Sequence, residues 1–151
     1  MNIKQQSPAP KPMAVQPARC IRTLLVDDSP IMLTTIARVL EKEGRTILIG
    51  AVTDGWLALR TALQSTPDLG LMDLHLPHLD GAEATRYLKL LPNPPIVFMV
   101  TSDDSPDARA ISKAAGADAF VVKAADLEAQ LRSKLEEWFG LAVDLTQSSG
   151  H

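Results

Sequence analysis

The sequence has a single cysteine and no apolar segment long enough to cross a bilayer. Cys20 alone excludes an intramolecular disulfide and a cysteine-based metal cluster. A membrane-spanning helix needs about 20 consecutive apolar residues, and no run in this chain approaches that length. The N-terminus lacks the apolar core of a signal peptide. We therefore expect a cytoplasmic protein without membrane insertion.

The chain also lacks the excess of positive charge that many nucleic-acid-binding proteins use. Its formal net charge is −3 over 151 residues, which argues against nucleic acid held by the overall field. Hydrophobic residues make up 46% and charged residues 22% of the chain, a composition typical of globular proteins. The length is enough for one domain with its own core.

Proline and basic residues are concentrated at the N-terminus. Residues 1–19 contain four prolines and three basic residues but no acidic residue. We expect this segment to be a disordered, Pro-rich basic tail, and a docking segment for a partner is the alternative. We expect residues 20–140 to form the folded domain and residues 141–151 to form a flexible tail.

Short apolar runs alternate with amphipathic segments along the expected domain. The expected strands are 20–26, 46–52, 69–72, 96–100 and 119–122. The expected helices are 30–43, 55–65, 81–91, 106–115 and 126–139. The second of these helices contains Leu57, Leu59 and Leu63. The alternation predicts an α/β fold, a doubly wound parallel sheet of five strands with five helices, for which 2-1-3-4-5 is a common strand order.

Polar residues follow four of these strands at their C-terminal ends. Asp27 and Asp28 follow the first strand, Asp73 the third, Thr101 the fourth and Lys123 the fifth. Since these ends converge at one edge of a doubly wound sheet, their side chains are expected to lie close together. Three neighbouring carboxylates would not all ionise unaided. A site with oxygen ligands and open coordination positions suits Mg²⁺. Bound Mg²⁺ would offset the repulsion among the three carboxylates.

This group of residues is chemically sufficient to accept a phosphoryl group. Asp73 can offer a free oxygen as nucleophile, because carboxylates do form aspartyl-phosphate intermediates. Mg²⁺, Lys123 and the Thr101 hydroxyl can each serve one oxygen of the transferred group. The chain has no Walker-type loop and no GxGxxG motif, so a nucleotide need not be the donor. Each residue alone has an ordinary explanation as a cap, turn or surface residue, and the prediction depends on their joint occurrence.

The same motifs resemble those of response-regulator receiver domains of two-component signalling, in the single-domain, chemotaxis-regulator-like class. The matching segments are Leu24–Ser29, Met72–Gly81, Val100–Ser102 and Phe120–Lys123. They occur in the family's order and spacing, and the resemblance covers about residues 21–139. It implies the flavodoxin-like version of the predicted fold.

The resemblance implies a role for each acidic position. Asp73 would be the phosphoacceptor, attacking a phosphohistidine of a histidine kinase or a phosphotransfer protein. Asp28 would bind Mg²⁺ directly and Asp27 would bind it through water. Asp73 and the backbone carbonyl of His75 would be further metal ligands.

The resemblance also implies a conformational switch. Thr101 would move onto the phosphoryl group, and Lys123 would contact that group. Phe120, three residues before Lys123, resembles the aromatic residue that turns inward after this movement, with simple core packing as the alternative. A downstream protein would then bind the surface formed by the fourth helix, the fifth strand and the fifth helix.

Three positions depart from the family's usual pattern. Ala124 replaces a proline after Lys123, and because a non-proline cis bond costs about 2.5–4 kcal/mol, we expect a trans bond or a shifted loop. Ser102 stands where a small apolar residue is usual. His75, two positions after Asp73, either shields the phosphoryl group or orients a water, or else points to solvent. We expect His75 and Ser102 to tune the phosphoryl lifetime.

The sequence therefore predicts a single-domain response regulator and not an enzyme with a separate substrate. It would catalyse only its own phosphorylation and a slow dephosphorylation. One alternative is a receiver-like interaction module that no longer uses phosphorylation. A less favoured alternative is a metal-dependent phosphatase with an aspartate nucleophile, since such enzymes use a carboxylate where this chain has His75.

Overall fold

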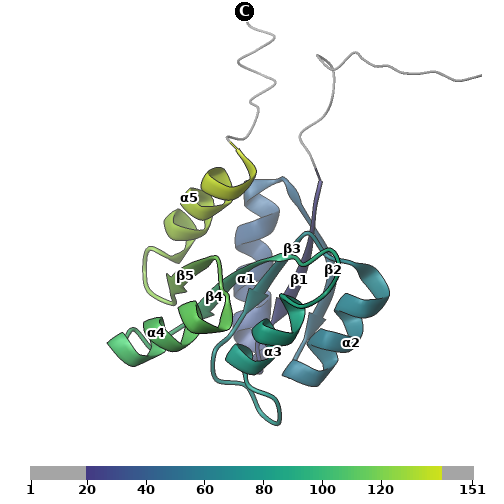
Figure 1. Cartoon of the computed structure of the whole chain (residues 1–151). Coiled ribbons are helices and arrows are strands. Elements are labelled where there is room, and N and C mark those ends of the chain that lie inside the picture. The colour runs from purple at the N-terminus through teal and green to yellow at the C-terminus, as the bar shows by residue number, and fades with distance from the viewer. Residues whose placement is uncertain (1–19, 141–151) are drawn as a thin grey trace, which may run out of the picture.

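The computed structural model describes residues 20–140, in which helices cover both faces of a parallel sheet (Figure 1). The strands are β1 (Ile21–Val26), β2 (Thr46–Val52), β3 (Leu69–Met72), β4 (Ile96–Thr101) and β5 (Ala119–Val122). The helices are α1 (Pro30–Glu43), α2 (Gly55–Ser65), α3 (Gly81–Leu88), α4 (Pro106–Ala115) and α5 (Leu127–Phe139). The tails predicted for residues 1–19 and 141–151 lie outside the described residues.

The sheet has the strand order β2-β1-β3-β4-β5, and every neighbouring pair is parallel. This order confirms the predicted doubly wound α/β fold. Within residues 20–140, no helix combines the length and the apolar character that crossing a membrane requires.

Two hydrophobic cores lie on opposite faces of the sheet. The core under α1 and α5 includes Leu25, Ile36, Leu40, Leu71, Phe98, Val121, Leu131 and Leu135. The core under α2, α3 and α4 includes Leu24, Ala58, Ala62, Met72, Ala84, Leu88, Val97, Met99 and Ala108. Since successive side chains of a strand point to opposite faces, the largely apolar central strands supply both cores.

Four helices begin at a side chain that caps the first turn. The capping oxygens of Ser29, Asp54, Asp80 and Ser105 accept the backbone N–H of the third residue of α1, α2, α3 and α4, respectively. Such caps satisfy backbone donors that have no partner within the helix. They also fix where each strand-to-helix loop ends, close to the C-terminal edge of the sheet.

The face that α2 turns toward the sheet carries small residues. Ala58 and Ala62 are buried, whereas Leu57 is 39% and Leu63 is 67% exposed. Of the three leucines in this helix, Leu59 packs against the core. The helix lies close to β2, since a Cβ added at Gly50 would lie 2.9 Å from a methyl carbon of Thr61.

Four element boundaries differ from the prediction, and two of these differences are that β1 and α5 begin one residue later than expected. Helix α3 ends at Leu88 rather than at residue 91, and the chain continues in tight turns in which Leu90 N–H bonds to the carbonyl of Tyr87. Strand β4 extends one residue further than predicted and includes Thr101. Thr101 is thereby part of the sheet ladder, paired in register with Val122 of β5.

The start of α3 lies against the backbone of Asp73. Gly81 N–H donates to the Leu74 carbonyl at 2.8 Å. A Cβ added at Gly81 would lie 1.9 Å from the Asp73 carbonyl oxygen, far inside van der Waals contact. Only glycine permits this approach, so Gly81 determines how α3 is placed beside Asp73.

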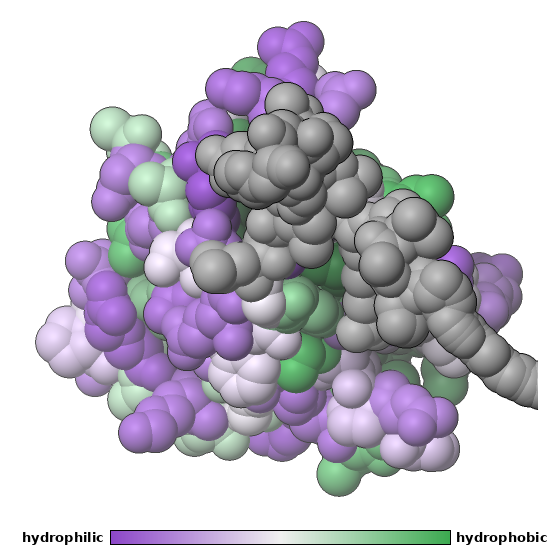
Figure 2. Space-filling model, turned by 90° about the horizontal axis from the view of Figure 1, so that it is seen from above, coloured by the Kyte–Doolittle hydropathy of each residue, from purple (hydrophilic) through white to green (hydrophobic). Residues whose placement is uncertain are grey.

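The polar strand ends lie at the lower edge of the sheet in Figure 1. Figure 2 looks from above onto the opposite edge, where β1 begins, and hydrophilic side chains cover much of the visible surface there.

We predict that Gly81→Ala destabilises the fold by about 3 kcal/mol, because the new methyl group forces α3 away from the Asp73 backbone. Urea denaturation measures the change. Gly70→Ala in β3 is the matched control, since its Cβ would meet only a methyl group of Val97 at 3.9 Å. We expect that change to cost less than about 1 kcal/mol. Equal losses in the two variants would contradict the steric explanation.

Candidate functional site

Asp73 follows β3, the central strand of the sheet, and β1 and β4 flank it. The sheet hydrogen bonds continue one residue past the strand ends. Asp73 N–H donates to the Val26 carbonyl at 2.9 Å, and Asp27 N–H donates to the Val52 carbonyl at 3.1 Å. The backbones of Asp27 and Asp73 are therefore fixed by the sheet rather than by a loop alone.

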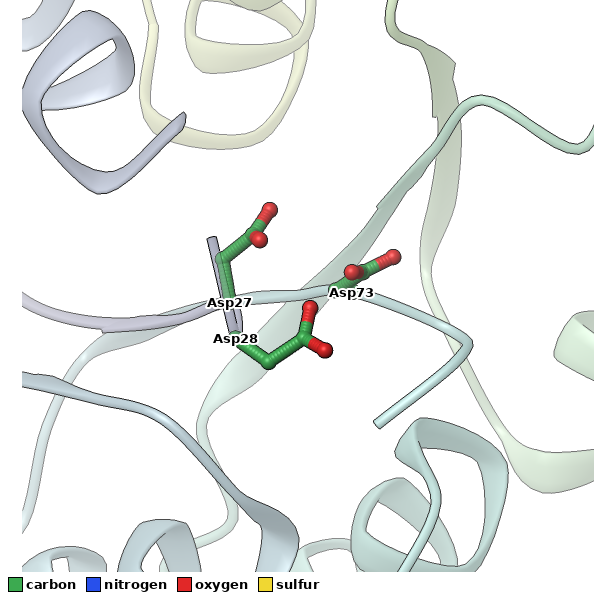
Figure 3. Close-up of side chains that lie close together, drawn as sticks. All are labelled: Asp27, Asp28 and Asp73. Carbon is green, nitrogen blue, oxygen red and sulfur yellow. The ribbon is translucent and has the colours of Figure 1, made fainter. Parts of the chain in front are cut away.

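Three carboxylates gather at this edge, as the sequence predicts (Figure 3). Asp27, Asp28 and Asp73 each offer one oxygen, and these oxygens all lie within 4.8 Å of one another. Asp27 and Asp73 are buried, whereas Asp28 is exposed. The cluster is thus open to solvent on the side of Asp28 and closed by protein on the other.

Lys123 places its ammonium between the two buried carboxylates. Its Nζ lies 2.6 Å from Asp27 Oδ2 and 3.3 Å from Asp73 Oδ2, and its side chain is 14% exposed. The peptide bond between Lys123 and Ala124 is trans, which agrees with the expectation from the sequence. Lysine at the end of the fifth strand therefore reaches the ends of the first and third strands without a proline after it.

The cluster retains an excess of negative charge. Three carboxylates face one ammonium, and burial raises the pKa of the Asp73 carboxyl. The Lys123 ammonium lowers this pKa and the Asp27 carboxylate raises it, in that order of importance. The Oδ2 atom of Asp27 is buried and forms an ion pair with the Lys123 ammonium. It accepts no hydrogen bond from any residue that the structure describes. A set of oxygen donors with excess negative charge and open positions fits a hard divalent cation such as Mg²⁺.

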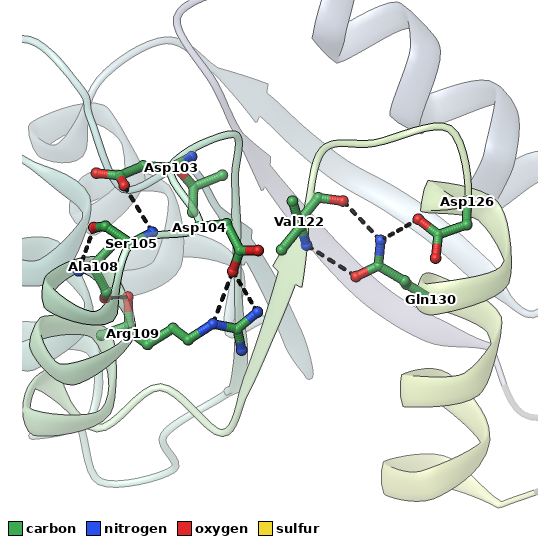
Figure 4. A network of polar contacts seen from close by, with 10 residues as sticks. Asp103, Asp104, Ser105, Ala108, Arg109, Val122, Asp126 and Gln130 are labelled. Atoms are coloured by element: carbon green, nitrogen blue, oxygen red, sulfur yellow. Dashed lines mark hydrogen bonds and ion pairs between the residues drawn. The ribbon is translucent and has the colours of Figure 1, made fainter.

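Thr101 and Phe120 lie on the neighbouring strands β4 and β5, and Thr101 is the last residue of its strand. Thr101 is buried, and its Oγ1 accepts a hydrogen bond from Asp103 N–H at 3.2 Å. Phe120 is partly buried against the core. The Arg109 guanidinium lies over the Phe120 ring, 4.6 Å from its centre, and also donates to Asp104 (Figure 4).

His75 is exposed, but its imidazole is not free in solvent. Its Nε2 lies 2.9 Å from Asp103 Oδ2 in the loop between β4 and α4. This contact lowers the pKa of the Asp103 carboxyl, and hydrogen bonds from Ser105 add to the effect. Ser102 is exposed beside this pair. Sequence reasoning missed Asp103, although it lies two residues after Thr101 just as His75 lies two residues after Asp73.

Residues 23–136 match the family model of the response regulator receiver domain. The chain is 37% identical over 102 residues to protein-glutamate methylesterase/protein-glutamine glutaminase 2 of Methanospirillum hungatei, a match covering 68% of the chain and 29% of that protein. It is 32% identical over 117 residues to transcriptional regulatory protein PrrA of Mycobacterium tuberculosis, covering 76% of the chain and 49% of PrrA. The chain thus spans about half the length, or less, of these curated relatives.

A similar solved structure is the receiver domain of a sensor histidine kinase from Pseudomonas aeruginosa, which contains a magnesium ion in its active site cleft. It is 31% identical to this chain with a TM-score of 0.72. The match covers 80% of this chain and 98% of that structure.

We predict that Asp73→Asn stabilises the metal-free fold at neutral and alkaline pH. Because the pKa of Asp73 is raised on folding, the folded state binds this proton more tightly than the unfolded chain. The free energy of unfolding therefore falls as pH rises from the unfolded pKa through the folded pKa, and the full penalty is present above both. In a chelating buffer, the thermal midpoint of Asp73→Asn should exceed that of the unsubstituted protein by more at about pH 8 than at about pH 4.

Asp107→Asn provides the matched control, because Asp107 is an exposed aspartate in the first turn of α4. We expect no gain in its thermal midpoint at either pH. An Asp73→Asn protein whose midpoint shift does not grow with pH would contradict the electrostatic penalty.

Proposed function

The chain belongs to the response regulator receiver domain family, and we propose that it is a phosphorylation-dependent signalling switch with Asp73 as the phosphoacceptor. The observation that carries the proposal is the setting of the Asp73 carboxylate. It is buried at the end of the central strand, within an acidic cluster and 3.3 Å from the Lys123 ammonium. A carboxylate placed in this way can act as a nucleophile toward phosphorus.

The proposed metal ligands are Asp27, Asp28 and Asp73, together with the backbone carbonyl of His75. Bound Mg²⁺ would supply positive charge to the oxygens of an incoming phosphoryl group and offset the repulsion among the carboxylates. The magnesium ion in the similar Pseudomonas receiver domain supports this assignment. The exposed Asp28 leaves the cluster open to an ion from solvent.

The proposed donor is a phosphohistidine on a histidine kinase or a phosphotransfer protein. A carboxylate oxygen of Asp73 attacks the phosphorus, and the bond from phosphorus to the donor nitrogen breaks as the new bond forms. Lys123 keeps its ammonium beside Asp73 and offers a hydrogen bond to one phosphoryl oxygen. Thr101 offers its hydroxyl to another oxygen from the end of β4. Beyond this transfer and slow hydrolysis of the product, the proposal includes no other reaction.

The signal then passes to a protein surface. Movement of the Thr101 hydroxyl toward the phosphoryl group vacates space beside β5, and Phe120 turns inward to fill it. The surface formed by α4, β5 and α5 changes, and with it the affinity for a downstream protein. In this proposal the receiver domain is residues 20–140, the protein acts in the cytoplasm, and it binds proteins rather than nucleic acid.

Intact-mass spectrometry after incubation with acetyl phosphate and Mg²⁺ tests the phosphoacceptor role. We expect a single phosphoryl adduct on the unsubstituted protein and on Asp107→Asn, in which an exposed aspartate is changed. Asp73→Asn and a sample treated with a chelator should show none. Absence of the adduct from the unsubstituted protein under a rapid quench would favour a phosphorylation-independent interaction module.

The contact between His75 and Asp103 leads to a second expectation. We predict that His75→Ala changes the dephosphorylation rate severalfold, because the imidazole is anchored at the entrance to the cluster and influences water near the phosphoryl group. Loss of the adduct over time measures the rate. His78→Ala is the control, since His78 is exposed in the same loop. An unchanged rate in His75→Ala would remove His75 from the lifetime mechanism.

A further inference from the structure

Strand β5 lies at an edge of the sheet and is bonded to β4 on one side only. The outer side of an edge strand exposes backbone N–H and C=O groups that have no strand partner. At Val122, the last residue of β5, a side chain of α5 takes the place of that partner. Val122 N–H donates to Gln130 Oε1 at 3.0 Å, and Gln130 Nε2 donates to the Val122 carbonyl at 2.8 Å (Figure 4).

A third hydrogen bond anchors the Gln130 amide to Asp126, the residue that precedes α5. Its Nε2 also donates to Asp126 Oδ1 at 2.9 Å. The reversed orientation would turn the amide NH₂ group toward the Val122 N–H and the amide oxygen toward a carboxylate. The three contacts therefore specify one orientation of the partly buried side chain.

The peptide group between Val122 and Lys123 is consequently held from two sides. Its carbonyl accepts from Gln130 in α5. Its N–H, which belongs to Lys123, donates to the Thr101 carbonyl of β4 at 2.9 Å. Because a peptide group is planar, it cannot rotate without breaking one of these bonds. Its orientation sets the direction in which the Lys123 side chain leaves the backbone.

The residues after Lys123 offer no comparable restraint through their side chains. Ala124 and Ala125 are exposed and carry only methyl groups. The Lys123 ammonium nevertheless lies within 3.3 Å of carboxylates that follow two other strands. A lysine side chain has many rotamers, so a fixed backbone origin reduces the number of positions that its ammonium samples.

We propose that Gln130 is a positioning residue for Lys123, holding the Val122–Lys123 peptide so that the ammonium stays at Asp73 in the reactive arrangement. The proposal rests on the phosphoacceptor function proposed above. It assigns to α5 an indirect part in phosphoryl transfer, through the peptide group that precedes Lys123.

Gln130→Met tests this role, because methionine keeps the length and helix propensity of the side chain but removes its amide. At saturating Mg²⁺, we expect phosphorylation by acetyl phosphate to slow by about tenfold as the peptide loses its outer hydrogen bonds. Gln64→Met is the matched control, since Gln64 is exposed near the end of α2, on the other face of the sheet. Its rate should equal that of the unsubstituted protein. An unchanged rate in Gln130→Met would overturn the proposal.

Introducing Gln130→Met into a Lys123→Ala protein distinguishes a positioning role of Gln130 from a general effect on stability. If Gln130 acts through Lys123, Gln130→Met should cause no further slowing when the ammonium is already absent. A purely structural role for Gln130 would produce the same slowing in both backgrounds. That second result would overturn the proposal even if Gln130→Met alone were slow.

Amide hydrogen exchange tests the hold on the peptide without any phosphoryl donor. In Gln130→Met, we expect exchange of the Lys123 N–H to accelerate by about tenfold, while that of Leu71 in the core of β3 stays unchanged. Unchanged exchange at Lys123 would overturn the positioning role. If the unsubstituted protein took up no phosphoryl group, the proposed function would fail, and the exchange result would still decide whether Gln130 fixes this peptide.

Discussion

Repulsion among three carboxylates at one edge of the sheet is the constraint on which the arrangement of the site depends. Two of these carboxylates are buried, where charge is least tolerated, and a single ammonium from β5 lies between them. Burial raises the pKa of Asp73 and the Lys123 ammonium counteracts that rise. The balance leaves the cluster negative and receptive to a cation, so the same repulsion that costs stability creates the capacity to bind one.

The fold keeps this unfavourable group together by attaching Asp27, Asp73 and Lys123 to the sheet. Backbone hydrogen bonds continue past the strand ends at Asp27, Asp73 and Lys123, and the close approach at Gly81 fixes α3 beside the acceptor. The energy that holds these residues in place comes from the two hydrophobic cores, which bury the central strands on both faces. The electrostatic cost of the charged edge is thus small compared with the stabilisation that the two hydrophobic cores supply.

Much of this arrangement could be predicted from the sequence, because it follows from short-range patterns. A polar residue directly after an apolar strand indicates a strand end, and parallel strands bring such ends to one edge. That rule predicts that Asp27, Asp28, Asp73, Thr101 and Lys123 lie at the same edge. The caps at Ser29 and Ser105 were equally local, since a helix start depends on only a few neighbouring residues.

What the sequence did not reveal depends on distances between elements. Helix α2 contains both leucines and alanines, and the structure shows that Ala58 and Ala62 are buried whereas Leu57 and Leu63 are exposed. The contact of His75 with Asp103 joins two loops. The hydrogen bonds between Gln130 and Val122 span the turn between β5 and α5, and the shape of that turn decides whether the amide can reach the strand. These contacts have no periodicity, so pattern reasoning does not detect them.

The stacking of Arg109 on Phe120 has a consequence for the resting protein. Arg109 is bound to Asp104 at the same time, so its guanidinium is held over the ring rather than free to follow it. A cation over an aromatic face at an exposed site contributes about 0.5–1 kcal/mol. If Phe120 turned inward, this energy would be lost, which lowers the population of the inward state by a factor of about two to five. The pair would thereby suppress spontaneous signalling in the absence of a stimulus, at the expense of some sensitivity when the stimulus arrives.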